Sequence, residues 1–179
     1  VADVRPGELD SAIQGIVAFG DGVAFTADDG EVGLEPWWSD GTPEGTVLIE
    51  DIFPGSKSSI PQELTVLGDM LLFTADDGET GRELWRADAG VTGAVQVADL
   101  WLGKTGSRPS RLFTAGGLLY FIAAANEATG FELWTSDGTG RHTLPLIHLA
   151  AGPRSVTLQR GIALGDTAYF VLSGTDLGL

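Results

Sequence analysis

Short apolar runs alternate with clusters of Gly, Asp and Thr along the whole chain. Between residues 64 and 100, four such runs cover residues 64–67, 70–75, 82–86 and 94–100, and turn residues close each of them. Runs of four to eight aliphatic, aromatic or β-branched residues between turn residues are typical of strands. Turns this short join antiparallel neighbours. The pattern therefore predicts an all-β chain made of four-stranded antiparallel meanders.

The second run of each unit is apolar almost throughout and does not alternate with polar residues. These runs cover residues 23–27, 71–75, 118–123 and 168–172. A strand without alternation is covered on both faces. Blades stacked around an axis cover both faces of every sheet, whereas a two-sheet sandwich leaves one face wet. We therefore predict a β-propeller of about four units with partial end units; a linear solenoid of meanders is the alternative.

A recurring tryptophan sets the period of the chain. Trp37, Trp85 and Trp134 each follow Gly-x-Glu-x, and they are 48 and 49 residues apart. A fixed period of this length indicates a repeat architecture. It divides the single domain, residues 1–179, into the end of a blade at 1–15, full blades at 16–63, 64–110 and 111–160, and the start of a blade at 161–179. The chain begins in mid-repeat and without Met, so we expect either an excerpt of a longer array or end pieces that close a ring.

Two stretches carry a resemblance to a known family. Glu132-Leu-Trp-Thr-Ser-Asp-Gly-Thr139, and Ser39-Asp-Gly-Thr-Pro-Glu-Gly-Thr46 with Asp51-Ile-Phe-Pro-Gly55, resemble the ELWxxDGT repeat family of bacterial proteins. The resemblance spans nearly the whole chain and implies a secreted or cell-surface repeat protein of propeller type. It supplies no catalytic residues. Pro36 and Ala89 depart from the pattern, and Pro36 predicts a distorted or edge strand because it lacks a ladder donor.

Composition narrows the classes of partner. The chain carries a formal net charge of −15, has no Cys and contains only two His. A surface this acidic argues against nucleic acid and anionic membranes as partners. The absence of Cys excludes disulfides, a thiolate nucleophile and Cys-ligated zinc. No apolar run reaches the roughly 18 residues of a membrane span, so we expect no membrane insertion.

The tryptophans fall into two groups. The three that follow the repeat are expected to pack between blades, since repeated aromatic residues in each blade are an architectural signal. Trp38 and Trp101 do not follow the repeat. These two are the candidates for exposed ligand-contact residues.

Acidic turns are the candidate metal sites. Two turns hold three carboxylates each, on Asp28, Asp29 and Glu31 and on Asp76, Asp77 and Glu79. Closely spaced carboxylate oxygens suit Ca²⁺, although the spacing does not match an EF-hand loop. The alternative is a solvated acidic hairpin. A separate recurring set is expected to form Asx turns: Asp40, Asp88 and Asp137.

The sequence thus favours a non-enzymatic, extracellular or cell-surface module for binding or scaffolding, with a protein or a glycan as its partner. Self-association, or the remainder of a longer propeller, is a further expected partner. The first alternative is a carbohydrate-binding lectin that works with or without Ca²⁺; no other cofactor is expected. The second is an enzyme-associated propeller with a site in its central channel. Catalytic residues are not indicated, because the chain has no Gly-x-Ser-x-Gly elbow and no phosphate loop.

Overall fold

The computed structural model describes residues 3–7, 10–147 and 156–173. In these ranges the chain forms strands and one short 3₁₀ turn, η1 (Gly140–His142), so the all-β prediction is confirmed. No helix in the described part is long and apolar enough to cross a membrane. The remaining residues belong to the predicted end pieces 1–15 and 161–179 and to the blade 111–160.

Three sheets have four strands in sequential antiparallel order, as predicted for the full units. The first contains β1 (Gln14–Phe19), β2 (Gly22–Asp28), β3 (Leu34–Ser39) and β4 (Val47–Leu48). The second contains β5 (Gln62–Leu67), β6 (Met70–Asp76), β7 (Arg82–Asp88) and β8 (Ala94–Ala98). The third contains β9 (Ser110–Ala115), β10 (Leu118–Ala124), β11 (Phe131–Ser136) and β12 (Leu144–Ile147). A hairpin of β13 (Thr157–Leu164) and β14 (Thr167–Ser173) follows them.

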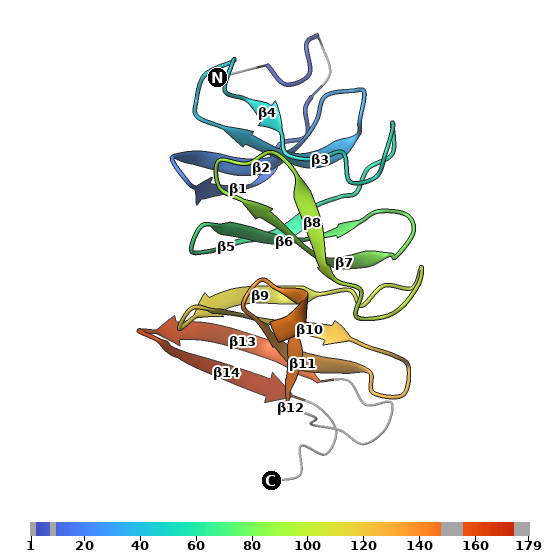
Figure 1. The fold of residues 1–179 in the computed structure, drawn as a ribbon, viewed down its shortest axis with the longest axis vertical. Coiled ribbons are helices and arrows are strands. Elements are labelled where there is room, and N and C mark those ends of the chain that lie inside the picture. Colours follow the sequence, from blue (N-terminus) through green and yellow to red (C-terminus); the bar gives the residue numbers. More distant parts are fainter. Residues whose placement is uncertain (1–2, 8–9, 148–155, 174–179) are drawn as a thin grey trace.

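The sheets are stacked in chain order along the long axis of the molecule (Figure 1). The first strands of successive sheets contact one another, β1 with β5, β5 with β9 and β9 with β13. The first sheet and the β13–β14 hairpin lie at opposite ends of the stack (Figure 1), so the described strands do not close into a ring. The described parts of the two end pieces therefore do not meet, contrary to the ring-closing expectation; residues 1 and 2 lie outside the described part.

The second strands are covered on both faces, as their uniform apolar sequence predicts. In β6, Leu71 and Phe73 belong to the core shared with the first sheet, while Leu72 belongs to the core shared with the third. All three side chains are 0% exposed. Stacking on two sides therefore explains why these strands do not alternate.

Two of the three repeat tryptophans, Trp85 and Trp134, pack between sheets, whereas Trp37 is half-buried. Trp85 is 9% exposed and joins Phe19 and Ile49 of the first unit, and Trp134 is 6% exposed and joins Leu72 of the second. A buried aromatic ring of this size stabilises its interface by several kcal/mol, about 3–5 kcal/mol on truncation to Ala. The predicted packing role is thus confirmed for these two tryptophans.

The position of Pro36 differs from the one expected from the sequence. It lies in β3, which is an inner strand between β2 and β4, and the β2–β3 register is unbroken from Val23↔Ser39 to Asp28↔Leu34. The carbonyl of Pro36 accepts a hydrogen bond of 2.9 Å from the N–H of Ile49. The predicted edge position was wrong, because proline removes one donor from the ladder and leaves its acceptor in place. On the side of β4 the ladder is short, with two register pairs between β3 and β4 compared with four between β7 and β8.

Candidate functional site

A glutamate two residues before each repeat tryptophan is buried. Glu35 and Glu83 are 0% exposed, and Glu132 is 2% exposed. The carboxylate of Glu83 accepts a hydrogen bond of 2.6 Å from the N–H of Ser107 and a second from its hydroxyl group. Glu35 bonds Ser59 in the same way, at 2.7 Å to the N–H and 2.5 Å to the hydroxyl. The carboxylates of Glu35 and Glu83 therefore each fix the loop that leads from their own sheet to the next.

These glutamates are structural groups that the sequence analysis missed, although their recurrence beside each tryptophan was a visible signal. Burial raises the pKa of Glu83 to about 7, and the hydrogen bonds from Ser107, Leu100 and Trp101 offset this only in part. Burial also raises the pKa of Glu35 above its ordinary value. Since the oxygens already accept bonds from the protein, we regard the glutamates as loop anchors.

The first acidic turn uses its aspartates to bind its own backbone. Asp28 accepts the N–H of Gly30 at 2.6 Å, and Asp29 accepts the N–H of Glu31 at 2.8 Å. The guanidinium of Arg5 lies 2.9 Å from the other oxygen of Asp28. These contacts are Asx turns with a neighbouring cation.

The second acidic turn repeats this geometry. Asp76 accepts the N–H of Gly78 at 2.8 Å, and Asp77 accepts those of Glu79 at 2.8 Å and Thr80 at 2.7 Å. Burial acts to raise the pKa of Asp77, but the bonds from Thr80 and Glu79 together outweigh it and hold the pKa below its ordinary value. Across the described ranges, no three Asp, Glu, His or Cys side chains converge as a metal-ligand set. Neither predicted triad is brought together, and calcium binding stays a prediction.

The turns after the third strands follow two designs. Asp40 accepts both the N–H (2.8 Å) and the hydroxyl (2.7 Å) of Thr42, and Asp137 does the same with Thr139 at 2.9 and 2.6 Å. Asp88 instead holds Arg86 through two bonds of 2.8 Å. The predicted Asx turn therefore forms in two copies. In the second copy, where Ala89 replaces Gly, the aspartate pairs with a cation.

Trp38 and Trp101, the two predicted contact residues, lie in different environments. Trp101 is half-buried in the loop after β8, where its backbone N–H lies 3.5 Å from Glu83. Trp38 lies in β3 and forms part of the wall of a pocket between the first and second sheets. The structure therefore separates the two candidates and connects only Trp38 with a cavity.

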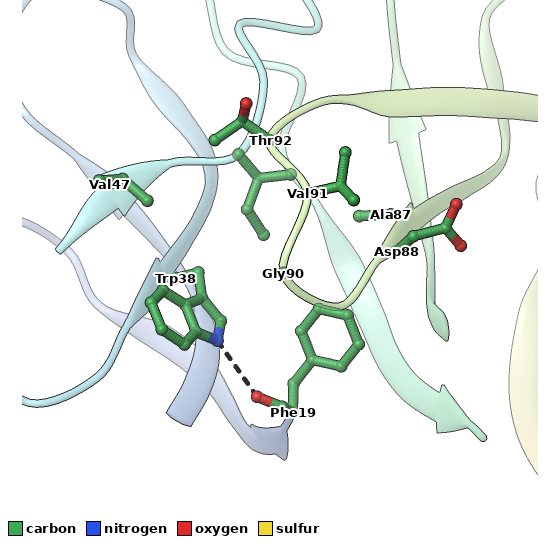
Figure 2. Close-up of a pocket in the computed structure, with 9 residues that line it drawn as sticks. Phe19, Trp38, Val47, Ala87, Asp88, Gly90, Val91 and Thr92 are labelled. Atoms are coloured by element: carbon green, nitrogen blue, oxygen red, sulfur yellow. Dashed lines mark hydrogen bonds between the residues drawn. The ribbon is translucent and has the colours of Figure 1, made fainter. Parts of the chain in front are cut away.

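This cavity, the Trp38 pocket, has a volume of about 150 Å³. Its lining residues are Phe19, Trp38, Val47, Ile49, Ala87, Asp88, Gly90, Val91 and Thr92. The indole N–H of Trp38 donates to the carbonyl of Phe19 at 3.1 Å, which fixes the plane of the ring (Figure 2). The carboxylate of Asp88 is directed away from Trp38 (Figure 2). The walls that face the space are therefore mainly hydrocarbon and aromatic.

Glycine at position 22 makes room for the indole. A Cβ atom at Gly22 would lie 2.7 Å from a ring carbon of Trp38 and 2.3 Å from the carbonyl oxygen of Ser39. The equivalent residues of the second sheet are Met70, which begins the second strand as Gly22 does, and Arg86, which has the strand register of Trp38. The Gly22–Trp38 pair is thus an alternative to the Met70–Arg86 pair.

The Met70–Arg86 pair fills the corresponding space at the next interface. Arg86 donates to the carbonyl of Gly138 at 3.3 Å, and a Cβ atom at Gly138 would lie 2.7 Å from the sulfur of Met70. The turn of the third sheet therefore packs directly on the second sheet. At the first interface, Trp38 meets the altered turn that contains Ala89. Two departures from the repeat coincide there and leave the Trp38 pocket open.

No protein-family model matches the chain, and no curated protein matches it. Among solved structures, the chain is similar to the computationally designed Ika4 protein in its crystal structure, with 17% sequence identity and a TM-score of 0.47. The similarity covers 97% of this chain and 96% of that chain. Because a likeness at this level assigns no family, the function has to be argued from the geometry described above.

Proposed function

We propose that this chain is a non-enzymatic binding module, built as an arc of β-propeller blades, that acts outside the cell or at its surface. Four-stranded meanders stacked face to face, with their first strands side by side, support the blade arrangement (Figure 1). The observation that carries the binding function is the Trp38 pocket.

The size and lining of the pocket define the chemistry of its ligand. A cavity of about 150 Å³ is known to hold one benzene molecule when its walls are apolar. In the Trp38 pocket, Phe19 and Trp38 supply aromatic surface and Val91 supplies aliphatic surface. The polar groups nearest this space already have partners, since Trp38 donates to Phe19 and Asp88 is held by Arg86. The ligand is therefore a neutral group the size of one ring.

A carbohydrate ligand is the second candidate, and the indole of Trp38 in the wall is the observation that favours it. Sugar binding by stacking also requires polar groups that pair with the hydroxyls. The pocket offers the hydroxyl of Thr92 and no free charged group among its lining residues. An apolar or aromatic ring therefore fits this site better than a sugar does. The enzyme-associated alternative has no comparable observation in its favour.

The test is a binding titration by isothermal calorimetry or two-dimensional NMR. The probes are phenol and indole in one arm and a panel of monosaccharides, with and without Ca²⁺, in the other. We expect saturable binding of the aromatic probes, with shifts confined to residues around Trp38. Saturable binding of sugars alone would support the lectin instead. No saturable binding by any ring-sized probe would refute the proposed site.

The repeat supplies a matched variant. Gly22→Met combined with Trp38→Arg gives the first interface the residues of the second, where Met70 and Arg86 contact the turn of the third sheet at Gly138. We expect the double variant to stay folded and to lose aromatic binding by at least about tenfold, which is about 1.4 kcal/mol. Val95→Phe is the control, because Val95 is 62% exposed and does not line the pocket. Equal binding by the double variant and the wild type would show that the probes bind elsewhere.

A further inference from the structure

The outward face of the β13–β14 hairpin carries large apolar side chains in water. They are Ile162 (61% exposed), Leu164 (72%), Tyr169 (53%) and Val171 (61%). The opposite face of the same hairpin packs Leu158, Phe170 and Leu172 on the third sheet. The hairpin therefore carries apolar side chains on both faces. The described part of the chain covers only the face that packs on the third sheet.

The repeat shows what covers this position elsewhere. Leu164 is the last residue before the tight turn to the second strand, and the same position is Phe19, Leu67 and Ala115 in the other units. Those three residues are 3%, 7% and 6% exposed. Phe19 and Leu67 belong to the cores that their sheets share with the sheet that follows, so burial at this position depends on a neighbouring sheet.

Val171 in the second strand of the hairpin gives the same result. Counted from the turn, its counterparts are Thr26, Thr74 and Ile122, which are 1%, 1% and 5% exposed. The three earlier units thus bury this position, while the hairpin exposes it. The outward face of β13–β14 is one half of an inter-sheet interface.

The opposite end of the stack carries the other half. The outward face of the first sheet has a hollow of about 170 Å³, and Ile16 at its edge is 64% exposed. The hollow is lined by Val4, Ile13, Ile16, Val23, Phe25, Ser39, Gly41 and Thr46. In the second sheet, the counterparts of Val23 and Phe25 are Leu71 and Phe73, which are 0% exposed under the first sheet. In the first sheet Val23 is half-buried, whereas Phe25 is 6% exposed and is already largely covered within its own chain.

Gly41 gives an independent indication of the missing neighbour. A Cβ atom at Gly41 would meet nothing within 4 Å, whereas one at the equivalent Gly138 would lie 2.7 Å from the sulfur of Met70 in the preceding sheet. The two glycines have similar backbone angles, with φ of +94° and +88°. The turn at Gly41 is thus shaped like a turn that packs on a preceding sheet.

We propose that these two faces bind each other between two copies of this chain, with the β13–β14 hairpin of one copy on the first sheet of the next. The occupant is a second copy because the molecule itself builds this kind of interface three times, between each pair of successive sheets. Such a contact is head-to-tail, so it generates rings or open arrays of copies. The proposal does not depend on the Trp38 pocket.

Charge sets the conditions under which the copies associate. Each copy carries a formal net charge of −15, so two copies repel each other at low ionic strength. Salt screens this repulsion and also favours the burial of apolar surface. Association is therefore expected to strengthen as the salt concentration rises, opposite to an interface held by ion pairs.

The experiment is sedimentation velocity of the chain over a range of concentrations, at low and high salt. We expect concentration-dependent association that is stronger at high salt. Leu164→Lys with Val171→Lys should weaken it at least about 30-fold, as expected for the loss of a central contact. Ile16→Lys should weaken it through the other face. The control is Val95→Lys, which charges an equally exposed valine on β8.

Mixing distinguishes a head-to-tail contact from a symmetric one. The Leu164→Lys/Val171→Lys variant keeps an intact first sheet, and the Ile16→Lys variant keeps an intact hairpin face. An equimolar mixture should form a one-to-one complex that grows no further. Near-UV circular dichroism shows whether each variant remains folded. A monomer at all concentrations, or association that Ile16→Lys leaves unchanged, would overturn the proposal, because the hairpin would then be covered within its own chain or by another hairpin.

Discussion

Replacing Glu83 by Gln tests the role of the buried loop anchors. Burial raises the pKa of Glu83 in the folded chain to about 7, compared with the ordinary value of 4.5 for a solvent-exposed glutamate. Folding therefore favours the protonated carboxyl group. The stability that this contributes is fully present below the unfolded pKa and is lost as the pH rises through about 7. The difference between the two values corresponds to about 3 kcal/mol.

The assay is urea unfolding of the wild type and E83Q at about pH 5.5 and about pH 8.5, a window that brackets the folded pKa. We expect the wild type to be more stable at the lower pH by about 2 kcal/mol from this group alone, because the full difference is reached only below the unfolded pKa. Glutamine has no proton to bind and resembles the protonated carboxyl in shape, so E83Q should lose this part of the pH dependence. Glu44→Gln is the control, because Glu44 is exposed.

E83Q should also be less stable than the wild type at the lower pH. Its amide nitrogen cannot accept one of the two bonds from Ser107, and a buried donor without a partner costs about 1–3 kcal/mol. If E83Q and the wild type show the same change in stability between the two pH values, Glu83 does not titrate in this range. The bonds from Ser107 would then outweigh burial, and the reasoning would be refuted.

Three further predictions follow from the turns and strand starts. Gly138→Ala should destabilise the fold more than Gly41→Ala in thermal melts, by about 1–3 kcal/mol. Both variants replace a glycine with positive φ, but only the new Cβ atom at position 138 would lie against a methionine sulfur. Equal losses of stability would contradict this packing. Arg111→Gly should raise the free energy of unfolding by about 0.5–1 kcal/mol, because Arg111 has a strained φ of +60° at the repeat position where Gly15 has φ +62°. A lower free energy of unfolding in the variant would show that the arginine side chain contributes more stability than the strain costs. Millimolar Ca²⁺ should leave the melting temperature unchanged, because the turn aspartates already accept backbone N–H groups; a rise that Asp76→Asn with Asp77→Asn halves would instead establish calcium sites.

The strands and their order could be predicted from the sequence because both are local properties. Apolar runs between turn residues specify strands, and short turns specify antiparallel pairing. The packing of Trp85 and Trp134 between sheets followed from their period. Bonds from a carboxylate to the next loop were less visible: Glu83 reaches Ser107, which is 24 residues away. A pattern that treats every Asp and Glu as a surface charge does not reveal such an anchor.

The candidate site was only partly predictable, for a related reason. Trp38 was recognised because it breaks the repeat, but its pocket also requires Gly22 beneath the indole and the altered turn at Val91 in the next unit. These residues come together only when two sheets stack. For the acidic turns, a count of carboxylates does not show that Asp76 and Asp77 accept hydrogen bonds from backbone N–H groups two residues further along the chain.

The glutamate anchors have a consequence for how the chain is made. Each anchor reaches forward by only 24 residues, from Glu35 to Ser59 and from Glu83 to Ser107, and each sheet then packs on the one before it. During synthesis the chain leaves the ribosome N-terminus first. Each unit can therefore fold as soon as it has emerged, because its contacts are short-range for a β protein. Until the next sheet has folded, the apolar face of the last completed sheet stays exposed. Lengthening the array by one repeat would move that vulnerable surface outward without enlarging it.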